Sequence, residues 1–388
     1  MEKLIINLIF DLDDKTSDAK LCNRLKRNII KKKRRNLLLK IFLDKKRRIP
    51  KVLDYFKVIQ KYPEDIFFDH FRMRRETFQN LLRELKPFWC TFRKGRLSFN
   101  LEQCLYITLW KLSNCGVTFR HLSDRFNVAK GTVHKIFHKT VRAICCLKKE
   151  IIWPSVLEQH TIMENFQNSR ENPFPFVIGC VDGTHVKIPK PKEDPISYYN
   201  RKGFYSINVQ AICDNKFRFL DVFIGYPGSC HDANVWNNSP IYNSVVGGQI
   251  QLAQNAIILG DSAYPLSTFL LTPYRDNGHL TREQKKFNFC LSSTRVMIEQ
   301  AFGILKNKFR ILYSMDTASH KKISKIVFAC TILHNFIINN GNPSEYISSN
   351  NNVIENDDFS STTINELPTG EDEDGVTLRN NLTTLFSS

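Results

Sequence analysis

The first half of the chain has the apolar spacing of amphipathic helices. Phe67, Phe71, Phe78 and Leu85 follow one another at intervals of four and seven residues, which bring side chains to one face of a helix. We interpret these residues as the core of a helical bundle and not as a binding stripe. The pattern predicts an all-helical region over residues 54–150.

The second half has the pattern of short buried strands followed by long helices. Continuous apolar runs of strand length occur at 176–181 and 256–259, and two further runs flank Asp214-Asn215, which predicts a β-hairpin. Strands combined with helices in this way predict an α/β domain over residues 151–340. The expected strands are 176–181, 184–188, 205–213, 217–224 and 256–259, and the expected long helices are 281–312 and 323–338.

Two short helical segments surround a tight break, at 117–126 and 130–139. Leu122, Val133 and Ile136 would pack between them as in a helix-turn-helix, whose second helix enters the major groove of DNA. An ordinary helical bundle with a basic surface explains the same pattern, and the residues alone leave both interpretations open. The side chains expected to face DNA are Lys130, Thr132, His134, Lys135, His138 and Lys139.

Composition indicates an anionic partner and argues against several classes of protein. The 388 residues carry a formal net charge of +18, which favours nucleic acid as the partner. No apolar run approaches the roughly 18 residues that span a bilayer, and the 11 cysteines include no CxxC pair, which argues against a zinc knuckle and a redox motif. We therefore expect no membrane partner and a reducing compartment inside the cell.

Charge is concentrated at the two ends of the chain. Residues 24–51 contain two basic clusters, 31–35 and 45–48, which favour a nuclear import signal or a phosphate-binding arm over a merely solvated helix face. Residues 341–388 are acidic and rich in Asn, Ser and Thr, so they lack the apolar surface that folding requires. We expect a basic arm at residues 1–53 and an acidic disordered tail at 341–388.

Two aspartates occupy matching positions behind buried runs. Asp182 directly follows the run 176–181, and Asp261 follows the run 256–259 with one glycine between. We expect each at the carboxyl end of a strand, where α/β folds place their ligand crevices. One such aspartate is commonly a turn or cap residue, but two at equivalent positions favour a shared site.

A third acid lies on a predicted helix. Glu299 shares one stripe of that helix with Arg295, Gly303, Lys306 and Arg310, and one acid among three bases suits a helix that meets a metal ion and a phosphate backbone. Salt bridging along a solvated face is the alternative. Clustered carboxylates without cysteine ligands suit Mg²⁺ or Mn²⁺, and two such ions can promote attack on a phosphodiester. The residues thus favour metal-dependent phosphodiester chemistry on DNA.

A series of short motifs occurs over about residues 170–340. The motifs are Val181-Asp-Gly-Thr-His185, Asn200-Arg-Lys-Gly203, Pro227-Gly-Ser-Cys-His-Asp232, Leu259-Gly-Asp-Ser-Ala-Tyr-Pro265, Thr272-Pro-Tyr274, Arg295 to Lys306 and Leu333-His-Asn335. In this order they resemble the PIF/Harbinger-type transposases and their domesticated nuclease relative. Each motif is weak alone, whereas the ordered set is specific to that family. Residues 70–73 and the helix-turn-helix segment also resemble the N-terminal part of these proteins.

The resemblance implies an RNase H-like catalytic domain joined to the N-terminal helix-turn-helix region. It also implies that Asp182, Asp261 and Glu299 bind divalent metal and act in catalysis. Asp232 matches a further acid of the family motif, so we include it as a fourth metal ligand, with a cap on the following helix as its alternative role. The DNA contacts expected around this core are Arg201, Lys202, Arg295 and Lys306.

The activity implied is that of a transposase-derived DNA nuclease that requires Mg²⁺ or Mn²⁺. Water attacks the phosphodiester, or a DNA 3′-hydroxyl does so if strand transfer is retained. The alternative is a catalytically silent domesticated protein that binds DNA or acts as an adaptor with a Myb-like DNA-binding partner. We expect a nuclear location, with a cytoplasmic pool also allowed, and a homo-oligomer is compatible with the family.

Overall fold

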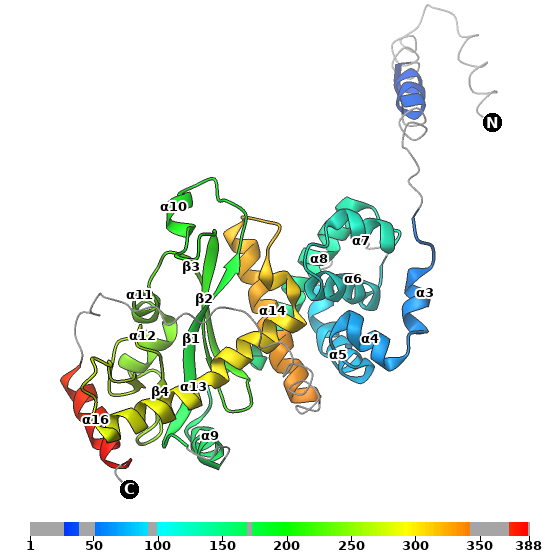
Figure 1. Cartoon of the computed structure of the whole chain (residues 1–388). Coiled ribbons are helices and arrows are strands. Elements are labelled where there is room, and N and C mark those ends of the chain that lie inside the picture. The colour runs from blue at the N-terminus through cyan, green and yellow to red at the C-terminus, as the bar shows by residue number, and fades with distance from the viewer. Residues whose placement is uncertain (1–26, 39–50, 92–98, 169–172, 342–371, 387–388) are drawn as a thin grey trace, which may run out of the picture. The chain divides into compact units, whose positions relative to one another are not determined.

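The computed structural model describes most of the chain (Figure 1). The chain divides into two units, residues 1–51 and residues 52–388. In the first unit, residues 27–38 form a helix that exposes the basic cluster 31–35. The second cluster, 45–48, lies outside the described residues. The described ranges are 27–38, 51–91, 99–168, 173–341 and 372–386.

The described part of residues 54–150 is helical, as its apolar spacing predicts. Phe67, Phe71 and Phe78 are at most 1% exposed, and the ring of Phe78 stacks on that of Tyr106 at 4.6 Å between centroids. The expected bundle core is therefore confirmed. The elements are α3 (Tyr55–Gln60), α4 (Glu64–Phe71), α5 (Arg75–Thr91), α6 (Leu101–Ser113), α7 (Phe119–Arg125), α8 (Lys130–Ile144) and a 3₁₀ helix, η1 (Cys145–Glu150).

Helices α7 and α8 lie where the two-helix motif is expected. The backbone N–H of Val128 donates to the carbonyl of Ser123 at 3.1 Å and closes the turn between them. Leu122, Val133 and Ile136 are fully buried. The packing of the two helices thus follows the sequence pattern, and a role for them in DNA binding stays a prediction.

A five-stranded mixed sheet forms the centre of the second half, in the order β3-β2-β1-β4-β5. Strands β1, β2 and β3 are antiparallel neighbours, whereas β4 and β5 run parallel to β1. The expected α/β class and the hairpin are confirmed. Residues 184–188 form no separate strand, because β1 continues through them. The strands are β1 (Val177–Lys187), β2 (Ser206–Cys213), β3 (Phe219–Pro227), β4 (Ile257–Leu259) and β5 (Leu270–Leu271).

Apolar residues on the two faces of the sheet belong to two separate cores. Neighbouring residues of a strand point to opposite faces, and Cys180 lies in the larger core while Val181 lies in the smaller one. Helices α13 and α14 pack on the larger core, and α11 and α12 belong to the smaller one. The helices of this half are α9 (Val156–Asn168), α10 (Pro195–Tyr198), α11 (Asp232–Asn237), α12 (Pro240–Val246), α13 (Arg282–Lys308), η2 (Arg310–Tyr313) and α14 (His320–Asn340).

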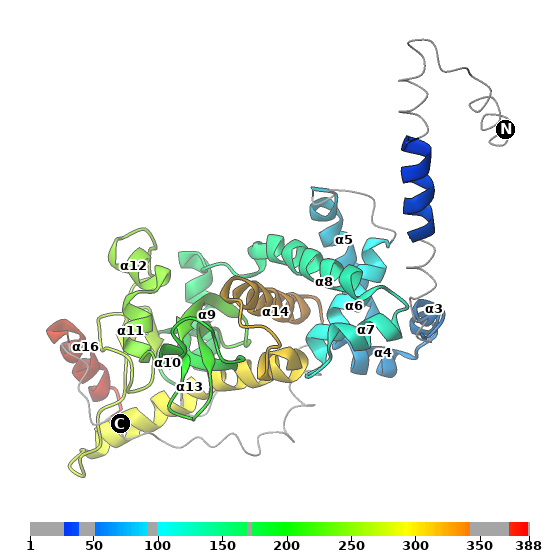
Figure 2. The same cartoon turned by 90° about the horizontal axis from the view of Figure 1, so that it is seen from above.

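Helix α14 connects the sheet with the helical region. It contacts β3 on one side and α5, α8 and η1 on the other, and Figure 2 shows it between these parts. Its buried apolar residues therefore contribute to the cores of both. Although α14 is largely buried, none of the helices in the described ranges has both the length and the apolar character of a membrane span.

The expectation of a disordered acidic tail is wrong for a C-terminal helix near its end, whereas residues 342–371 lie outside the described residues. Residues Glu373–Thr384 form α16, which packs against α13 and β5. The guanidinium of Arg379 lies 4.4 Å from the ring centroid of Tyr274, whose hydroxyl donates to Asn380 Oδ1 at 2.8 Å. Leu378, Leu382 and Phe386 of this segment pack against the larger core at four-residue spacing. This short apolar stripe is easily overlooked among the polar and acidic residues of the tail.

Candidate active site

The register of two parallel strands brings Asp182 and Asp261 together. Cys180 of β1 is paired with Leu259 of β4, and each aspartate follows its paired residue by two positions. Two positions along a strand restore the same face, and the carboxylate of Asp182 contacts Arg295 of α13. Asp261 lies two residues past the end of β4, where the charge of the same arginine acts on it. Asp182 lies inside β1 and not at its end, which corrects one expectation. Strand β4 ends at Leu259, whereas β1 continues to Lys187.

Burial and mutual repulsion dominate the electrostatics of these acids. The pKa of Asp182 is raised to about 7, first by burial and then by the negative charges of Asp261 and Asp232, while Arg295 opposes the rise. Burial also raises the pKa of Asp261. The backbone N–H of Gly183 donates to Asp182 Oδ1 at 2.7 Å. The protein therefore holds acidic groups together at an energetic cost, which is common at functional sites.

Arg295 and Glu299 of α13 complete this side of the site. Arg295 Nη1 donates to Asp182 Oδ2 at 3.1 Å, and Nη2 donates to Glu299 Oε1. All three side chains are largely shielded from water. Arg295 is thus directed at carboxylates in this structure, and its expected role as a DNA contact stays a prediction. We call Asp182, Asp232, Asp261 and Glu299 the carboxylate cluster.

Asp232 approaches from the opposite face of the sheet. It is the first residue of α11, whose N-cap is His231, so the alternative role of Asp232 as the cap is wrong. Asn208 Nδ2 donates to Asp232 Oδ1 at 3.1 Å. A Cβ atom placed on Gly183 would lie 2.6 Å from the same oxygen. A glycine is therefore needed at position 183 for Asp232 to come this close to β1.

Tyr264 is a member of the site that sequence reasoning missed. Its side chain is buried, and its hydroxyl has no hydrogen-bond partner. Burial raises the pKa of Tyr264, and Asp232, Asp182 and Asp261 add to the rise, so the hydroxyl lies in the field of all three acids. Its position three residues after Asp261 in the Gly-Asp-Ser-Ala-Tyr-Pro motif was the available signal.

The donor set suits a hard divalent cation. Three aspartates gather with a buried hydroxyl that lacks a partner, and carboxylate oxygens are the ligands that Mg²⁺ and Mn²⁺ prefer. The types of ligand atom therefore fit such a cation, although the side chains are not arranged as a complete ligand shell. Within the described ranges, no three His, Cys, Asp or Glu side chains are grouped as a ready-made metal site.

Basic side chains lie beyond the carboxylates, along β1. The pKa of His185 is lowered to about 4 by burial, and Lys306 and Lys202 add to the effect, which places both lysines near this end of the strand. Arg201 is exposed, and its Nη2 contacts the ring of His231 at 3.0 Å. These expected DNA contacts therefore gather at one margin of the site.

The predicted contacts on α8 do not all face outward. Lys130 and Lys135 are exposed, but the ring of His134 packs on Phe119 at 5.0 Å between centroids. The amine of Lys139 lies over the ring of Trp89. The outward surface is therefore mainly lysine, which suits phosphate better than base edges. The partly buried residues of the predicted set are Thr132, His134, His138 and Lys139.

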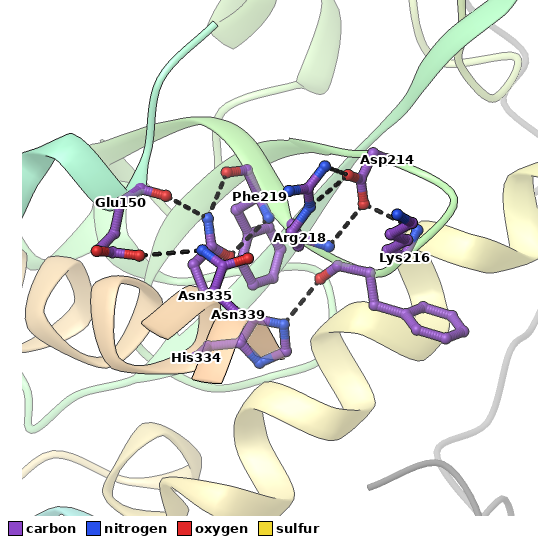
Figure 3. A network of polar contacts seen from close by, with 9 residues as sticks. Glu150, Asp214, Lys216, Arg218, Phe219, His334, Asn335 and Asn339 are labelled. Carbon is purple, nitrogen blue, oxygen red and sulfur yellow. Dashed lines mark hydrogen bonds and ion pairs between the residues drawn. The ribbon is translucent and has the colours of Figure 1, made fainter. Parts of the chain in front are cut away.

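A second group of polar side chains holds the β2–β3 hairpin (Figure 3). Asn335 accepts a hydrogen bond from the backbone N–H of Phe219 and donates to the carbonyls of Phe219 and Glu150, at 2.7 to 2.9 Å. His334 Nε2 lies 2.8 Å from the carbonyl of Phe217. The Leu-His-Asn motif of α14 is therefore structural in this chain, because its polar side chains contact backbone groups.

The buried carboxylate of Asp214 belongs to the same group. Its oxygens accept hydrogen bonds from the backbone N–H groups of Lys216 and Arg218, each at 2.9 Å, and from Arg218 Nε at 2.7 Å. Every one of these partners lies within the hairpin turn. We call Asp214, Arg218, His334 and Asn335 the hairpin network.

Comparison with protein families identifies two segments. Residues 181–335 match a family described as a DDE superfamily endonuclease, a span that includes all four acids of the carboxylate cluster. Residues 54–146 match a family described as a domain of unknown function. The helical region therefore recurs in other proteins, without a role that could be carried over.

Curated relatives agree with the first match. The human protein named "Putative nuclease HARBI1" is 34% identical over 172 residues, which are 43% of this chain and 47% of that protein. The Arabidopsis thaliana protein named "Protein ALP1-like" is 28% identical over 291 residues, which are 69% of each chain. The chain thus matches about half the length of the nuclease-named relatives and more of the plant protein.

One solved structure also matches, at low similarity. It is a piggyBac transposase synaptic complex with hairpin DNA, with a TM-score of 0.34 and 10% identity over 85% of this chain and 82% of that chain. A TM-score of that size carries no argument about the fold. Residues 181–335 therefore carry a DDE superfamily endonuclease domain, and this part of the chain is similar to the relatives named as putative nucleases.

Proposed function

We propose that this protein is a transposase-derived DNA nuclease that depends on a divalent metal ion. The observation that carries the proposal is that Asp182 and Asp261 each follow, by two residues, the paired Cys180 and Leu259 of two parallel strands. Glu299 lies on α13 and is joined to Asp182 through Arg295. The strand order 3-2-1-4-5, with β4 and β5 parallel to β1, supports an RNase H-like core.

Asp182, Asp261 and Asp232 would hold the cation, and Glu299 would join them once released from Arg295. A bound Mg²⁺ or Mn²⁺ would supply Lewis acidity toward the phosphate oxygens and lower the pKa of an attacking water. The chain's own acids fix the place of attack because they are buried on rigid elements. Water adds to phosphorus, the bond from phosphorus to the 3′-oxygen breaks, and that oxygen takes up a proton. With a DNA 3′-hydroxyl in place of water, the same exchange would join two strands.

The positive margin around Lys202, Lys306 and Arg201 supports DNA as the substrate. These side chains offset the repulsion between a polyanion and the carboxylate cluster, and such binding weakens with added salt. The exposed lysines of α8 would add phosphate contacts within the same unit. The helix at residues 27–38, which exposes the basic cluster 31–35, supports a nuclear location.

Nicking of supercoiled plasmid DNA tests the proposal. The wild-type protein should nick in Mg²⁺ or Mn²⁺ and not in a chelator, and Asp182→Asn should abolish nicking while the protein stays folded. Asp65→Asn, which changes an exposed acid of α4, is the matched control and should nick at the wild-type rate. Equal nicking by Asp182→Asn and the wild type would exclude the assignment.

A catalytically silent DNA-binding or adaptor protein is the second candidate. It is favoured by the absence of a ready-made metal site among the described residues and by the pairing of Arg295 with two of the acids. One Arabidopsis thaliana relative, 27% identical over 72% of this chain, is named as an antagonist of like heterochromatin protein 1. Salt-sensitive DNA binding without cleavage in any metal would support this candidate. Capture of a Myb-like protein by the full chain tests the expected partner, and light scattering tests self-association.

A further inference from the structure

Arg295 links the two sides of the candidate active site. One nitrogen of its guanidinium donates to Asp182 on β1 at 3.1 Å, and another donates to Glu299 one turn along α13. The exposed fractions of the three side chains are 18 or 19%. A planar guanidinium that engages two carboxylates away from bulk water makes strong, geometrically specific contacts.

These contacts use oxygen atoms that a metal ion would need. A hard divalent cation binds carboxylate oxygens at about 2.0–2.6 Å, whereas Asp182 Oδ2 and Glu299 Oε1 already accept hydrogen bonds from Arg295. Arg295 also lowers the pKa of Asp261, so its charge acts on three of the four acids. The cluster thus has enough acids for a metal site, but an internal positive charge already holds two of them.

We propose that Arg295 is a positioning residue, an internal counter-ion that holds Asp182 and Glu299 in the metal-free protein and leaves at least one of them when a divalent cation binds. The inference rests on the proposed function, because it takes the carboxylate cluster as the metal site. It has two consequences. First, the positive charge of Arg295 offsets the repulsion between the acids when no metal is bound. Second, a metal ion binds more weakly than it would to the acids alone, because it must displace the contact of Arg295 with at least one carboxylate.

Binding of Mn²⁺ to the full chain without DNA tests the inference, with free Mn²⁺ measured by electron paramagnetic resonance. Arg295→Gln should lower the Kd for Mn²⁺ about tenfold. Lys285→Gln removes the same charge from an exposed position of α13 and should change the Kd less than twofold. Arg295→Lys keeps the charge but cannot fork between two carboxylates, so its Kd should lie between those of the wild type and Arg295→Gln.

Thermal unfolding supplies a readout that does not depend on activity. In a chelator, Arg295→Gln should unfold at a lower temperature than the wild type, and added Mn²⁺ should raise its midpoint by more. An unchanged or higher Kd in Arg295→Gln would overturn the inference. Should that variant fail to fold, the Kd of Arg295→Lys decides in the same way, and a value equal to or above that of the wild type overturns it.

The same experiments separate this inference from the proposed function. Plasmid nicking by the wild type with Mn²⁺, combined with an unchanged Kd in Arg295→Gln, would overturn the counter-ion role and leave the nuclease. No Mn²⁺ binding by any variant at millimolar concentration, together with no nicking, would overturn both.

Discussion

The carboxylate cluster and the hairpin network both contain buried acids, but the surroundings of those acids differ. Asp214 is fully buried and surrounded by donors from its own turn, whereas Asp182 is surrounded by other acids, and its pKa is raised to about 7 mainly by burial. A buried carboxylate supplied with donors stabilises the fold locally. Acids held together without enough donors cost stability, and such a cost is retained where a site has a function. The contrast distinguishes the two groups more reliably than their residue types do.

The largest expected effect is on activity, at the carboxylate cluster. In the wild type the backbone N–H of Ala263 donates to Asp261 Oδ1 at 2.9 Å. Asp261→Asn keeps an oxygen that can accept this hydrogen bond but removes one negative charge. Because a bound metal supplies several kcal/mol to the transition state, plasmid nicking should fall on the order of 10³-fold or more. The thermal midpoint of Asp261→Asn should equal or exceed that of the wild type, since the repulsion between the acids of the carboxylate cluster is relieved. A midpoint well below wild type would show that the cluster is structural.

The next largest effect is on stability, at the hairpin network. Asn335→Ala removes three hydrogen bonds to buried backbone groups of Phe219 and Glu150. Leaving a buried polar group unpaired costs about 1–3 kcal/mol, so urea unfolding should show a loss of about 3 kcal/mol or more. Asn339→Ala is the control, because its amide donates to the exposed carboxylate of Glu150. It should change stability by less than about 1 kcal/mol. Equal losses in the two variants would contradict the assignment.

Sequence reasoning identified the fold class and one half of the site. Apolar runs located β1 and β4, and the position of an aspartate just behind each run indicated a shared site. The pairing of Cys180 with Leu259, which makes the two offsets equal, is visible only in the structure. The four-residue spacing of Arg295 and Glu299 allowed their pairing, but the contact of Arg295 with Asp182 joins residues 113 positions apart in the chain. No local pattern records such a contact.

The motif around Asn335 shows the other limit. Its side chain serves three backbone groups, and those groups are determined by the hairpin turn and by η1. In a sequence, an asparagine with a catalytic role cannot be told from an asparagine with a structural role. Only the position of the β2–β3 hairpin against α14 reveals which role applies here.

An intermediate effect is expected from pH, through His334. Burial lowers the pKa of His334 to about 3, and Lys308 adds to the effect, whereas the unfolded residue titrates near 6.5. Between these values the unfolded state binds the extra proton, so this contribution to stability is complete above pH 6.5 and is lost as the pH falls. Linkage gives about 1.4 kcal/mol per pH unit, or about 2 kcal/mol from pH 6.5 to 5.

Urea unfolding at pH 7.5 and 5.0 in a chelator measures this contribution. His334→Gln can still donate to the carbonyl of Phe217 but does not titrate. The variant should therefore lose about 2 kcal/mol less than the wild type over that interval. The carboxylate cluster titrates alike in both proteins and cancels in the difference. Identical pH dependence in the two would show that folding does not shift the pKa of His334.

The smallest expected effect returns to the carboxylate cluster and concerns a single methyl group. In Gly183→Ala the new Cβ would lie 2.6 Å from Asp232 Oδ1, closer than such atoms approach, so Asp232 must move away from β1. The displacement should lower nicking about tenfold, since small misplacements of a catalytic group are costly.

Gly303→Ala is the matched control, because no atom lies within 4 Å of its Cβ position. The same change inside α13 should raise stability by about 0.5–1 kcal/mol, and it controls for the addition of a methyl group where space allows. Full activity in Gly183→Ala would remove Asp232 from the site and leave the cluster with three acids. Reduced activity in Gly183→Ala alone would show that the packing of α11 against β1 positions an acid for the reaction.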